Sequence, residues 1–587
     1  MGSAIVALAV LLAAPSIGTG YQADDFMLQR GLSQGLGNGF RLFDHPGAAE
    51  RAAGLVPWWA SEDLRIAFFR PLAELTHAFD QAVAPGSAAF AHVHNLAWFA
   101  AMLAAALALL RRLVGRPWLA HLALVVYAID DARGPAVGWI ANRNGLMAAA
   151  FGFLALWAHD RWRRGSEADR AGRGARLLAP LAFALALLSG EIGVSTGALL
   201  LAYALVYERG RWWRRLAPLW PYAALGAAWL AAHHLGGYGT FGQDGYLDPL
   251  SRPLAFLGRV ATVTPALLGG ALGVWSDFLP AVAGVAALAY VAVDCAVIAI
   301  WALFFRSLWQ RFEVVRFGLL GSLLGTLPLA GGAVTDRYLV FVSLGVAIAA
   351  AVFLGQVPDP SLRSPRQTAR VYRHLIRPTA LITTCLWIGG GALGLPSRAR
   401  SMVYVGAALG ELEQAVQGAD DGRRWFAVTV TSEAFVDYLP LACAGPTASL
   451  PAGVCAGRDA TRRRRVAPRR QHAGARGGPG ALRDAGRSLH RARDRLQRRP
   501  ARERRRLRRR HRGAGRRPAP DARAPRARPA ARGGRALPAL RRPGTGRGGR
   551  RRPSAATCAG RGRSIDLIER YLFSAEAGSV RRDGPAP

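Results

Sequence analysis

The sequence predicts an all-α, polytopic membrane protein followed by a basic tail that does not fold. Apolar runs of about 20 residues, the length that crosses a bilayer, recur from the N-terminus to about residue 395. Arginine gathers in short segments that follow alternate runs. From about residue 443 the chain consists mostly of Arg, Ala, Gly and Pro, and such a composition buries too little apolar surface to form a core.

The net charge of the chain belongs mainly to this tail. Among 587 residues the formal net charge is +39, and all 76 basic residues are Arg. Residues 458–587 contain 41 Arg and 9 acidic residues, whereas residues 1–457 contain 35 Arg and 28 acidic residues. The body is therefore only mildly basic, and the high total charge does not describe its surface.

Five basic segments predict the topology. Short cytoplasmic loops collect Arg, so these segments define one face of the bundle, and a cytoplasmic N-terminus accounts for all of them. They are residues 111–117, 159–176, 207–215, 306–316 and 363–377. The opposite, outer face then carries residues 21–87, 130–145, the break near Gly190, 236–259 and 333–337. We expect about 10 spans plus interfacial helices, with residues 260–275 as a re-entrant or interfacial helix.

The first outer loop, residues 21–87, contains a further helical pattern. Residues 61–83 place apolar side chains at helical spacing, with acids and His on the other side. A helix lying in the membrane interface shows this pattern, and so does an ordinary helix packed on the bundle. The loop begins with two adjacent acids, Asp24 and Asp25, directly after the first apolar run.

The five Cys residues show no metal-binding spacing, because neither a Cys-x-x-Cys nor a Cys/His pattern occurs. Cys295 and Cys385 lie within apolar runs, where a buried and inert thiol is expected. Cys443 and Cys455 could pair in an oxidising compartment, but the geometry of such a pair cannot be read from a sequence.

Five short motifs occur in an order shared with one class of membrane enzymes. In chain order they are "YQADDF" (21–26), "FFRPLAELTHAFD" with "AFAHVHNLAWF" (68–80 and 89–99), "WIANRNG" (139–145), "LLSGEIG" (187–193) and "TDRYLVF" (335–341). Over about residues 1–355 the chain resembles membrane glycosyltransferases of the GT-C class. Within that class it is similar to polyprenyl-phosphate-sugar-dependent O-mannosyltransferase-like proteins (glycosyltransferase family 39-like). It departs from their pattern at four places: Ala91 separates Phe90 from His92, Gly190 replaces a usual Lys, Asp336 a Glu and Val342 a Pro.

The resemblance implies a GT-C-type helical bundle over residues 1–397, with its active site built from the first outer loop. The implied reaction is an inverting transfer of a sugar from a polyprenyl-phosphate carrier to a protein, lipid or glycan acceptor. The implied location is a bacterial plasma membrane, with the site on its outer face. The implied catalytic residues are Asp25 and Asp24, and the implied substrate-binding residues are Arg70, His92, Asn95, Arg143, Glu191, Asp336 and Arg337.

The chemistry of such a transfer explains these residue types. A carboxylate can remove the proton of the acceptor hydroxyl, and an adjacent carboxylate could raise its pKa or help bind Mg²⁺ or Mn²⁺. Arg binds phosphate with two parallel hydrogen bonds and stays charged. Between Asp24 and Asp25 the sequence does not decide, and we favour Asp25.

Each of these residues also has a plainer interpretation. The acidic pair is compatible with a polar boundary at the end of a span, and Arg70 with an interfacial Arg whose charge reaches water. Asp336 and Arg337 are compatible with a local ion pair at a helix end. Glu191 is a functional residue if it lies at membrane depth, but a solvated group if the break lies at the surface. His77, His92 and His94 are expected to satisfy loop hydrogen bonds rather than to bind metal.

Two other function classes fit a polytopic chain. A transporter would show broken helices at matching positions of two internal repeats, and no such repeat is seen. A lipid-carrier ligase or polymerase of similar architecture would share the carrier and differ in the acceptor.

The C-terminal part divides into two segments. Residues 398–442 read as the start of a small outer-face domain, and residues 443–587 as a disordered low-complexity tail. The tail is either a basic disordered region or the product of a shifted reading frame. A Lys-free body implies GC-rich DNA, whose shifted frames encode Arg, Ala, Gly and Pro, so we favour the frameshift. Because the tail would lie on the outer face, no nucleic-acid partner is expected.

Overall fold

A computed structural model describes residues 1–47, 61, 63–165, 170–242, 246–282, 284–364 and 368–401. These residues belong to one of two compact units of the chain, Met1–Arg458 with Gly562–Pro587. The other unit, Asp459–Arg561, lies outside the described residues. The predictions for the small outer domain, the basic tail and the Cys443–Cys455 pair also fall outside them.

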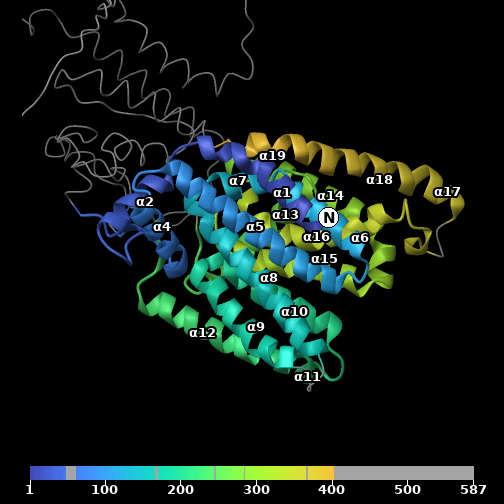
Figure 1. The fold of residues 1–587 in the computed structure, drawn as a ribbon, viewed down its shortest axis with the longest axis horizontal. Helices are drawn as coiled ribbons and strands as arrows, with labels where there is room; N and C mark the ends of the chain where they lie inside the picture. The colour runs from blue at the N-terminus through green and yellow to red at the C-terminus, as the bar shows by residue number, and fades with distance from the viewer. Residues whose placement is uncertain are drawn as a thin grey trace, which may run out of the picture. The chain divides into compact units, whose positions relative to one another are not determined.

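The all-α prediction is confirmed, because the described residues form a bundle of helices with one small sheet. The main helices are α1 (Gly2–Ala13), α5 (Ala88–Leu113), α6 (Pro117–Ile129), α8 (Arg143–Arg164), α9 (Arg170–Ser189), α10 (Ser195–Tyr207), α12 (Trp220–Leu235), α13 (Pro253–Ala271), α14 (Val285–Arg311), α15 (Glu313–Leu329) and α16 (Leu339–Gly355). The last segment runs through α17 (Ala369–Val371), α18 (Arg377–Thr384) and α19 (Gly391–Ala399), and Figure 1 shows it along one side of the bundle.

Six segments of the described residues are long and apolar enough to cross a membrane. They are Ala88–Leu113, Gly172–Ser189, Pro253–Ala271, Val285–Arg311, Asp336–Gly355 and Ala369–Ala399, and three shorter apolar segments are Gly2–Gly18, Pro117–Ile129 and Glu191–Tyr207. Helix α16 is buried along its whole length and forms the centre of the bundle. Its Gly345 meets α15 so closely that an added Cβ would lie 1.9 Å from the carbonyl oxygen of Gly318. Such small residues let membrane helices approach each other.

The five basic segments meet at one end of the bundle, as the Arg distribution predicts. Ion pairs and hydrogen bonds of their side chains connect each segment to the next, so that the contacts form a closed ring. The contacts are Arg112 with Asp160 (2.7 Å), Arg163 with Glu208 (2.6 Å), Arg209 with Glu313, Arg116 with Asp359, and Arg311 with the carbonyl oxygen of Leu362 (3.1 Å). The four carboxylates lie within or beside the basic segments and partly neutralise them.

Helix α13 has both ends near the same predicted outer loop. Near its start, Arg259 donates a hydrogen bond to the carbonyl oxygen of Gly332 (2.9 Å). Shortly after its end, the backbone N–H of Ser276 donates to the carboxylate of Asp336 (2.8 Å). The re-entrant or interfacial course stays a prediction, because α13 is also long and apolar enough to span.

Among its described residues, the first outer loop has two helices and two strands. Helix α2 (Asp24–Ser33) is followed by strands β1 (Arg41–Asp44) and β2 (Arg65–Ala67) and by helix α4 (Pro71–Val83). Strand β3 (Gly239–Phe241), from the loop after α12, completes an antiparallel sheet in the order β1-β2-β3.

The predicted helix over residues 61–83 is therefore wrong in its first part. Residues 65–67 form the central strand, because their backbone pairs on both sides, and the helix begins at Pro71, which suits the first helical position. The rest of the pattern is confirmed. Leu75, Phe79 and Val83 form a stripe along α4, and each is more than half exposed.

The expectation of buried thiols at Cys295 and Cys385 is also wrong. Both side chains are exposed on the surface of the helices that carry them. An apolar run in a membrane bundle can face lipid rather than the interior, so an apolar neighbourhood in the sequence does not show burial.

Candidate functional site

Asp25 is a buried residue that fixes the start of α2. One carboxylate oxygen accepts a hydrogen bond from the backbone N–H of Gln22 (2.8 Å), and the other accepts from the N–H of Ala141 (2.7 Å). Ala23, in the turn between Gln22 and Asp25, has a φ of 47°, a left-handed conformation that is uncommon for a residue with a side chain. Asp25 therefore holds a strained turn and connects the first outer loop to the second.

The groups around Asp25 are held in their neutral forms. Burial raises the pKa of the Asp25 carboxyl to about 8, although its two backbone hydrogen bonds act in the opposite direction. Burial and the nearby charge of Arg143 hold the pKa of His77 well below its usual value, and burial raises the pKa of Tyr21. These side chains line a common small pocket. At neutral pH this side of α2 therefore offers a protonated acid rather than a base.

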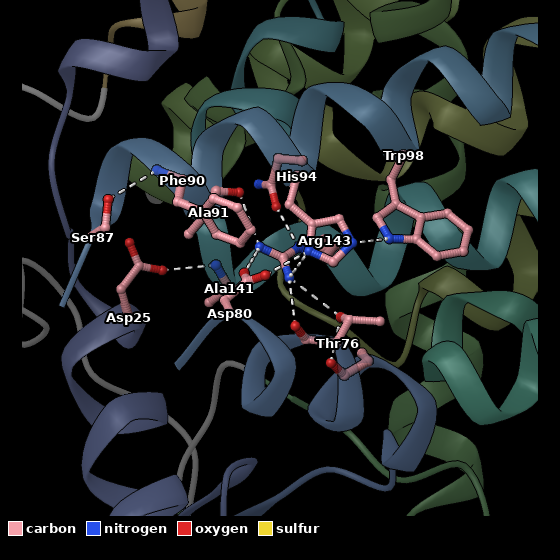
Figure 2. A network of polar contacts seen from close by, with 12 residues as sticks. Asp25, Thr76, Asp80, Ser87, Phe90, Ala91, His94, Trp98, Ala141 and Arg143 are labelled. Atoms are coloured by element: carbon pink, nitrogen blue, oxygen red, sulfur yellow. Dashed lines mark hydrogen bonds and ion pairs between the residues drawn. The ribbon is translucent and has the colours of Figure 1, made fainter. Parts of the chain in front are cut away.

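Arg143 lies at the centre of a polar network with Thr76, Asp80, Ala91 and His94 (Figure 2). Its side chain is fully buried. It forms an ion pair with Asp80 (2.5 Å), and its Nε donates to the side chain of Asn95 (2.6 Å). Its remaining N–H groups face the carbonyl oxygens of Thr76 and Ala91. Because protein groups use the whole guanidinium, Arg143 joins α4, α5 and α8 and has no donor left for a phosphate.

His92 and Asn95 lie next to the Arg143 network. Both are fully buried on α5. The Nε2 atom of His92 lies 3.0 Å from the carbonyl oxygen of Gly20, at the entry to the first outer loop. The Asn95 amide donates to the carbonyl oxygen of Trp139 (3.1 Å). The structure thus brings these two predicted residues together with Arg143, beneath the acidic pair.

Asp24 faces a different environment. It is half-buried, and it lies close enough to Arg337 and Tyr246 for its charge to act on both side chains. Arg337 lies over the ring of Trp139, with 4.8 Å from its guanidinium carbon to the ring centroid, and over Tyr338 at 5.4 Å. This side of α2 therefore carries a carboxylate within electrostatic reach of an arginine that lies against aromatic rings.

A second arginine, Arg259, shares the aromatic neighbours of Arg337. The phenol groups of Tyr246 and Tyr338 lie within electrostatic reach of both guanidinium groups. Burial raises the pKa of Tyr246 to about 12, so its phenol stays protonated and can donate a hydrogen bond. Sequence reasoning missed Arg259. Its signal would have been an Arg at an outer-face boundary, against the preference of Arg for the cytoplasmic side.

Arg70 and Glu191, predicted separately, are partners. The Nε of Arg70 donates to the Glu191 carboxylate (2.7 Å), which also accepts from the backbone N–H of Phe69 (2.9 Å). The guanidinium carbon of Arg70 lies 4.0 Å from the ring centroid of Phe68. Glu191 begins the short helix η3 (Glu191–Val194) after the break at Gly190. The pair thus connects the first outer loop to this break.

Asp336 pairs with a distant arginine rather than with its neighbour Arg337. Its carboxylate accepts hydrogen bonds from Arg398 (2.6 Å) and from the hydroxyl of Ser276 (2.6 Å). The plainer prediction of a local Asp336–Arg337 ion pair is therefore not what these contacts show. Arg398, at the end of α19, was not predicted from the sequence.

A divalent cation, which the sequence leaves possible, does not fit the arrangement of the acidic pair. Both oxygens of Asp25 already accept backbone hydrogen bonds, so the pair does not present a shared set of oxygen ligands. Within the described residues no group of three or more His, Cys, Asp or Glu side chains could hold a metal ion. No chemical step is therefore assigned to a cation.

Comparisons with known proteins return no matching family model and no matching curated protein. Two solved structures are similar in fold. ArnT from Cupriavidus metallidurans, bound to undecaprenyl phosphate, is 14% identical with a TM-score of 0.41, over 75% of this chain and 84% of ArnT. The Archaeoglobus fulgidus oligosaccharyltransferase, tethered to an acceptor peptide, is 12% identical with a TM-score of 0.35, over 75% of this chain and 63% of that chain. Both are GT-C glycosyltransferases, the class that the sequence motifs resemble. At these TM-scores the likeness says nothing about substrate or site residues.

Proposed function

We propose that this chain transfers a sugar from a polyprenyl-phosphate carrier to a protein, lipid or glycan acceptor at the outer face of a bacterial plasma membrane. The observation that carries the proposal is the arrangement of Arg337 against Trp139 and Tyr338, within electrostatic reach of Asp24, with Arg259 in reach of Tyr338 and Tyr246. A base and phosphate-binding cations in one region are what a direct displacement from a phosphate needs. The apolar helices of the bundle would let the polyprenyl tail stay in hydrocarbon.

The proposed base is Asp24 rather than Asp25. Asp25 is buried, protonated at neutral pH and engaged by two backbone N–H groups, and it serves to hold the turn. Asp24 is half-buried and lies within electrostatic reach of the positive charge of Arg337. This choice departs from the preference for Asp25 that the sequence alone suggested.

The proposed reaction is a single displacement with inversion at C1 of the sugar. The Asp24 carboxylate takes the proton of the acceptor hydroxyl while the acceptor oxygen forms a bond to C1. The bond from C1 to the phosphate oxygen breaks, and its electron pair stays on the phosphate. Arg337 and Arg259 stabilise the added negative charge, and the phenol of Tyr246 donates to the same phosphate. Polyprenyl phosphate is the leaving group.

Arg70, Glu191, Arg143, His92 and Asn95 have positioning roles in this proposal. The Arg70–Glu191 pair and the Arg143 network fix the first outer loop on the bundle. They thereby hold the start of α2, and with it Asp24, opposite Arg337.

The test uses the full chain in phosphatidylcholine nanodiscs and a polyprenyl-phosphate-linked radiolabelled sugar. Release of polyprenyl phosphate that depends on added acceptor would support the proposal. The Asp24→Asn variant should lose this release, whereas Asp63→Asn, at an exposed position of the same loop, should keep it. Equal rates for the two variants would exclude Asp24 as the base. A ligase or polymerase acting on the same carrier would instead produce lengthened carrier-linked glycans.

A further inference from the structure

Arg398 binds three carboxylates from three different segments of the outer face. Its guanidinium lies 2.6 Å from Asp336, 2.5 Å from Asp277 and 3.4 Å from Asp131. The Arg398 side chain is only 17% exposed, and Asp336 is 1% exposed. The indole of Trp275 donates to Asp131 (3.1 Å) and lies over the guanidinium at 5.5 Å. We call Arg398 and these three carboxylates the Arg398 clamp.

The end of α19 approaches its neighbour very closely at this point. A Cβ added to Gly134, in helix α7 (Arg133–Gly138), would lie 2.5 Å from the Cβ of Arg398. A Cβ added to Gly138 would lie 2.1 Å from the carbonyl oxygen of Ala399. Only glycine leaves room for this approach, so the position of Arg398 is set by backbone packing as well as by charge.

The Arg398 clamp fixes the backbone immediately before Arg337. The Asp336 carboxylate accepts hydrogen bonds from Ser276 on one oxygen and from Arg398 on the other. The backbone N–H of Asp336 donates to the carboxylate of Asp277 (2.9 Å). Asp336 is therefore fixed through both its side chain and its backbone, and Arg337 is the next residue of the same short helix, η6 (Asp336–Tyr338).

We propose that Arg398 is a positioning residue, which holds Arg337 in the geometry that binds the phosphate of the lipid carrier. This inference rests on the proposed function, because it assigns the phosphate to Arg337. It also connects the end of α19 to the site, across 61 positions of sequence between Arg337 and Arg398.

The physical reason is charge balance in a confined space. Without the guanidinium, three carboxylates with the same charge would remain close together and repel one another. The segment that begins at Asp336 would then relax away from Asp277, and Arg337 would move with it. Lys in place of Arg398 would keep the charge but could not bind three carboxylates at once, because its ammonium is a single point charge.

The experiment measures binding of farnesyl phosphate, a short polyprenyl phosphate, to the full chain in phosphatidylcholine nanodiscs. We expect Arg398→Gln to weaken binding about tenfold, as for coupled neighbouring residues, and Arg398→Lys to weaken it less. Gly134→Ala, which displaces Arg398 without changing any charge, should also weaken it. Arg400→Gln is the control, since Arg400 is an exposed neighbour on the same segment.

A double-mutant cycle separates positioning from general loss of structure. In an Arg337→Gln background, Arg398→Gln should have no further effect on the affinity for farnesyl phosphate, because it acts through Arg337. An equal loss in both backgrounds would overturn the inference, and so would wild-type affinity in a folded Arg398→Gln variant. If the wild-type chain itself does not bind farnesyl phosphate, the proposed function fails first, and the inference fails with it.

Discussion

Substituting the two adjacent acids one at a time is expected to separate catalysis from stability. Asp24→Asn removes the proposed base, and the loss of a positioned general base typically lowers kcat by about 10²- to 10⁴-fold. Its effect on stability should be small, because the side chain is half-buried at the start of a helix. We therefore expect a folded, almost inactive protein.

Asp25→Asn is expected to do the reverse. An amide can present only one oxygen, so the N–H of either Gln22 or Ala141 would face an NH₂ group and lose its acceptor. A buried donor left without a partner costs about 1–3 kcal/mol. The turn at Ala23, which already has a left-handed backbone, would be less firmly held. Near pH 4, where keeping Asp25 protonated costs little, we expect reduced stability. At the pH of the activity assay we expect a rate lowered much less than in Asp24→Asn.

The assay pairs the rate of polyprenyl-phosphate release with the unfolding midpoint in a denaturant series, for wild type and both variants. Asp63→Asn serves as the control for a neutralised acid in the same loop. A folded Asp25→Asn protein without activity, together with an active Asp24→Asn protein, would refute the assignment of the base. It would also show that a carboxyl with a pKa near 8 can act as the base here.

Three further outcomes are expected. Burial raises the pKa of Asp25 from 3.8 to about 8, so the unfolded state binds fewer protons than the folded state between these pH values. The free energy of unfolding should therefore fall as pH rises from 4 to 8, by roughly 1.4 kcal/mol per pH unit. The Asp25→Asn variant should lack this slope when unfolding is measured as a function of pH. A double-mutant cycle of Arg70 with Glu191, read by thermal unfolding, should give a coupling of about 1 kcal/mol, and zero coupling would contradict the observed pair. In thermal unfolding, Gly345→Ala should destabilise the bundle by about 1–3 kcal/mol through overpacking against α15. Gly389→Ala is the control, because its added Cβ meets no other atom within 4 Å, and its stability should equal that of wild type.

The arrangement of the loops could be predicted from the sequence because it depends on local composition. Arg is enriched in short cytoplasmic loops, so its distribution along the chain predicts the topology, and the ring of basic segments agrees with it. The central strand at residues 65–67 could not be predicted in this way. Its partner β3 lies about 170 residues later in the sequence, and no local pattern in residues 61–83 distinguishes a paired strand from the first turn of a helix.

The partners of the site residues were beyond prediction for the same reason. Glu191 meets Arg70 over 121 positions, and Arg398 meets Asp131 over 267. Each of these residues is an ordinary charged side chain in its own segment. Only the folded bundle shows which charges pair within the protein.

The acidic pair shows how adjacency in sequence can mislead. Successive residues of an α-helix point about 100° apart, so Asp24 and Asp25, at the first two positions of α2, reach different surroundings. One meets an arginine among aromatic rings, and the other is enclosed with His77 and two backbone N–H groups. A pair that suggests a joint site in the sequence thus becomes one candidate base and one buried acid that holds it in place. In the proposed function, the strained turn at Ala23 would present Asp24 only while Asp25 secures it.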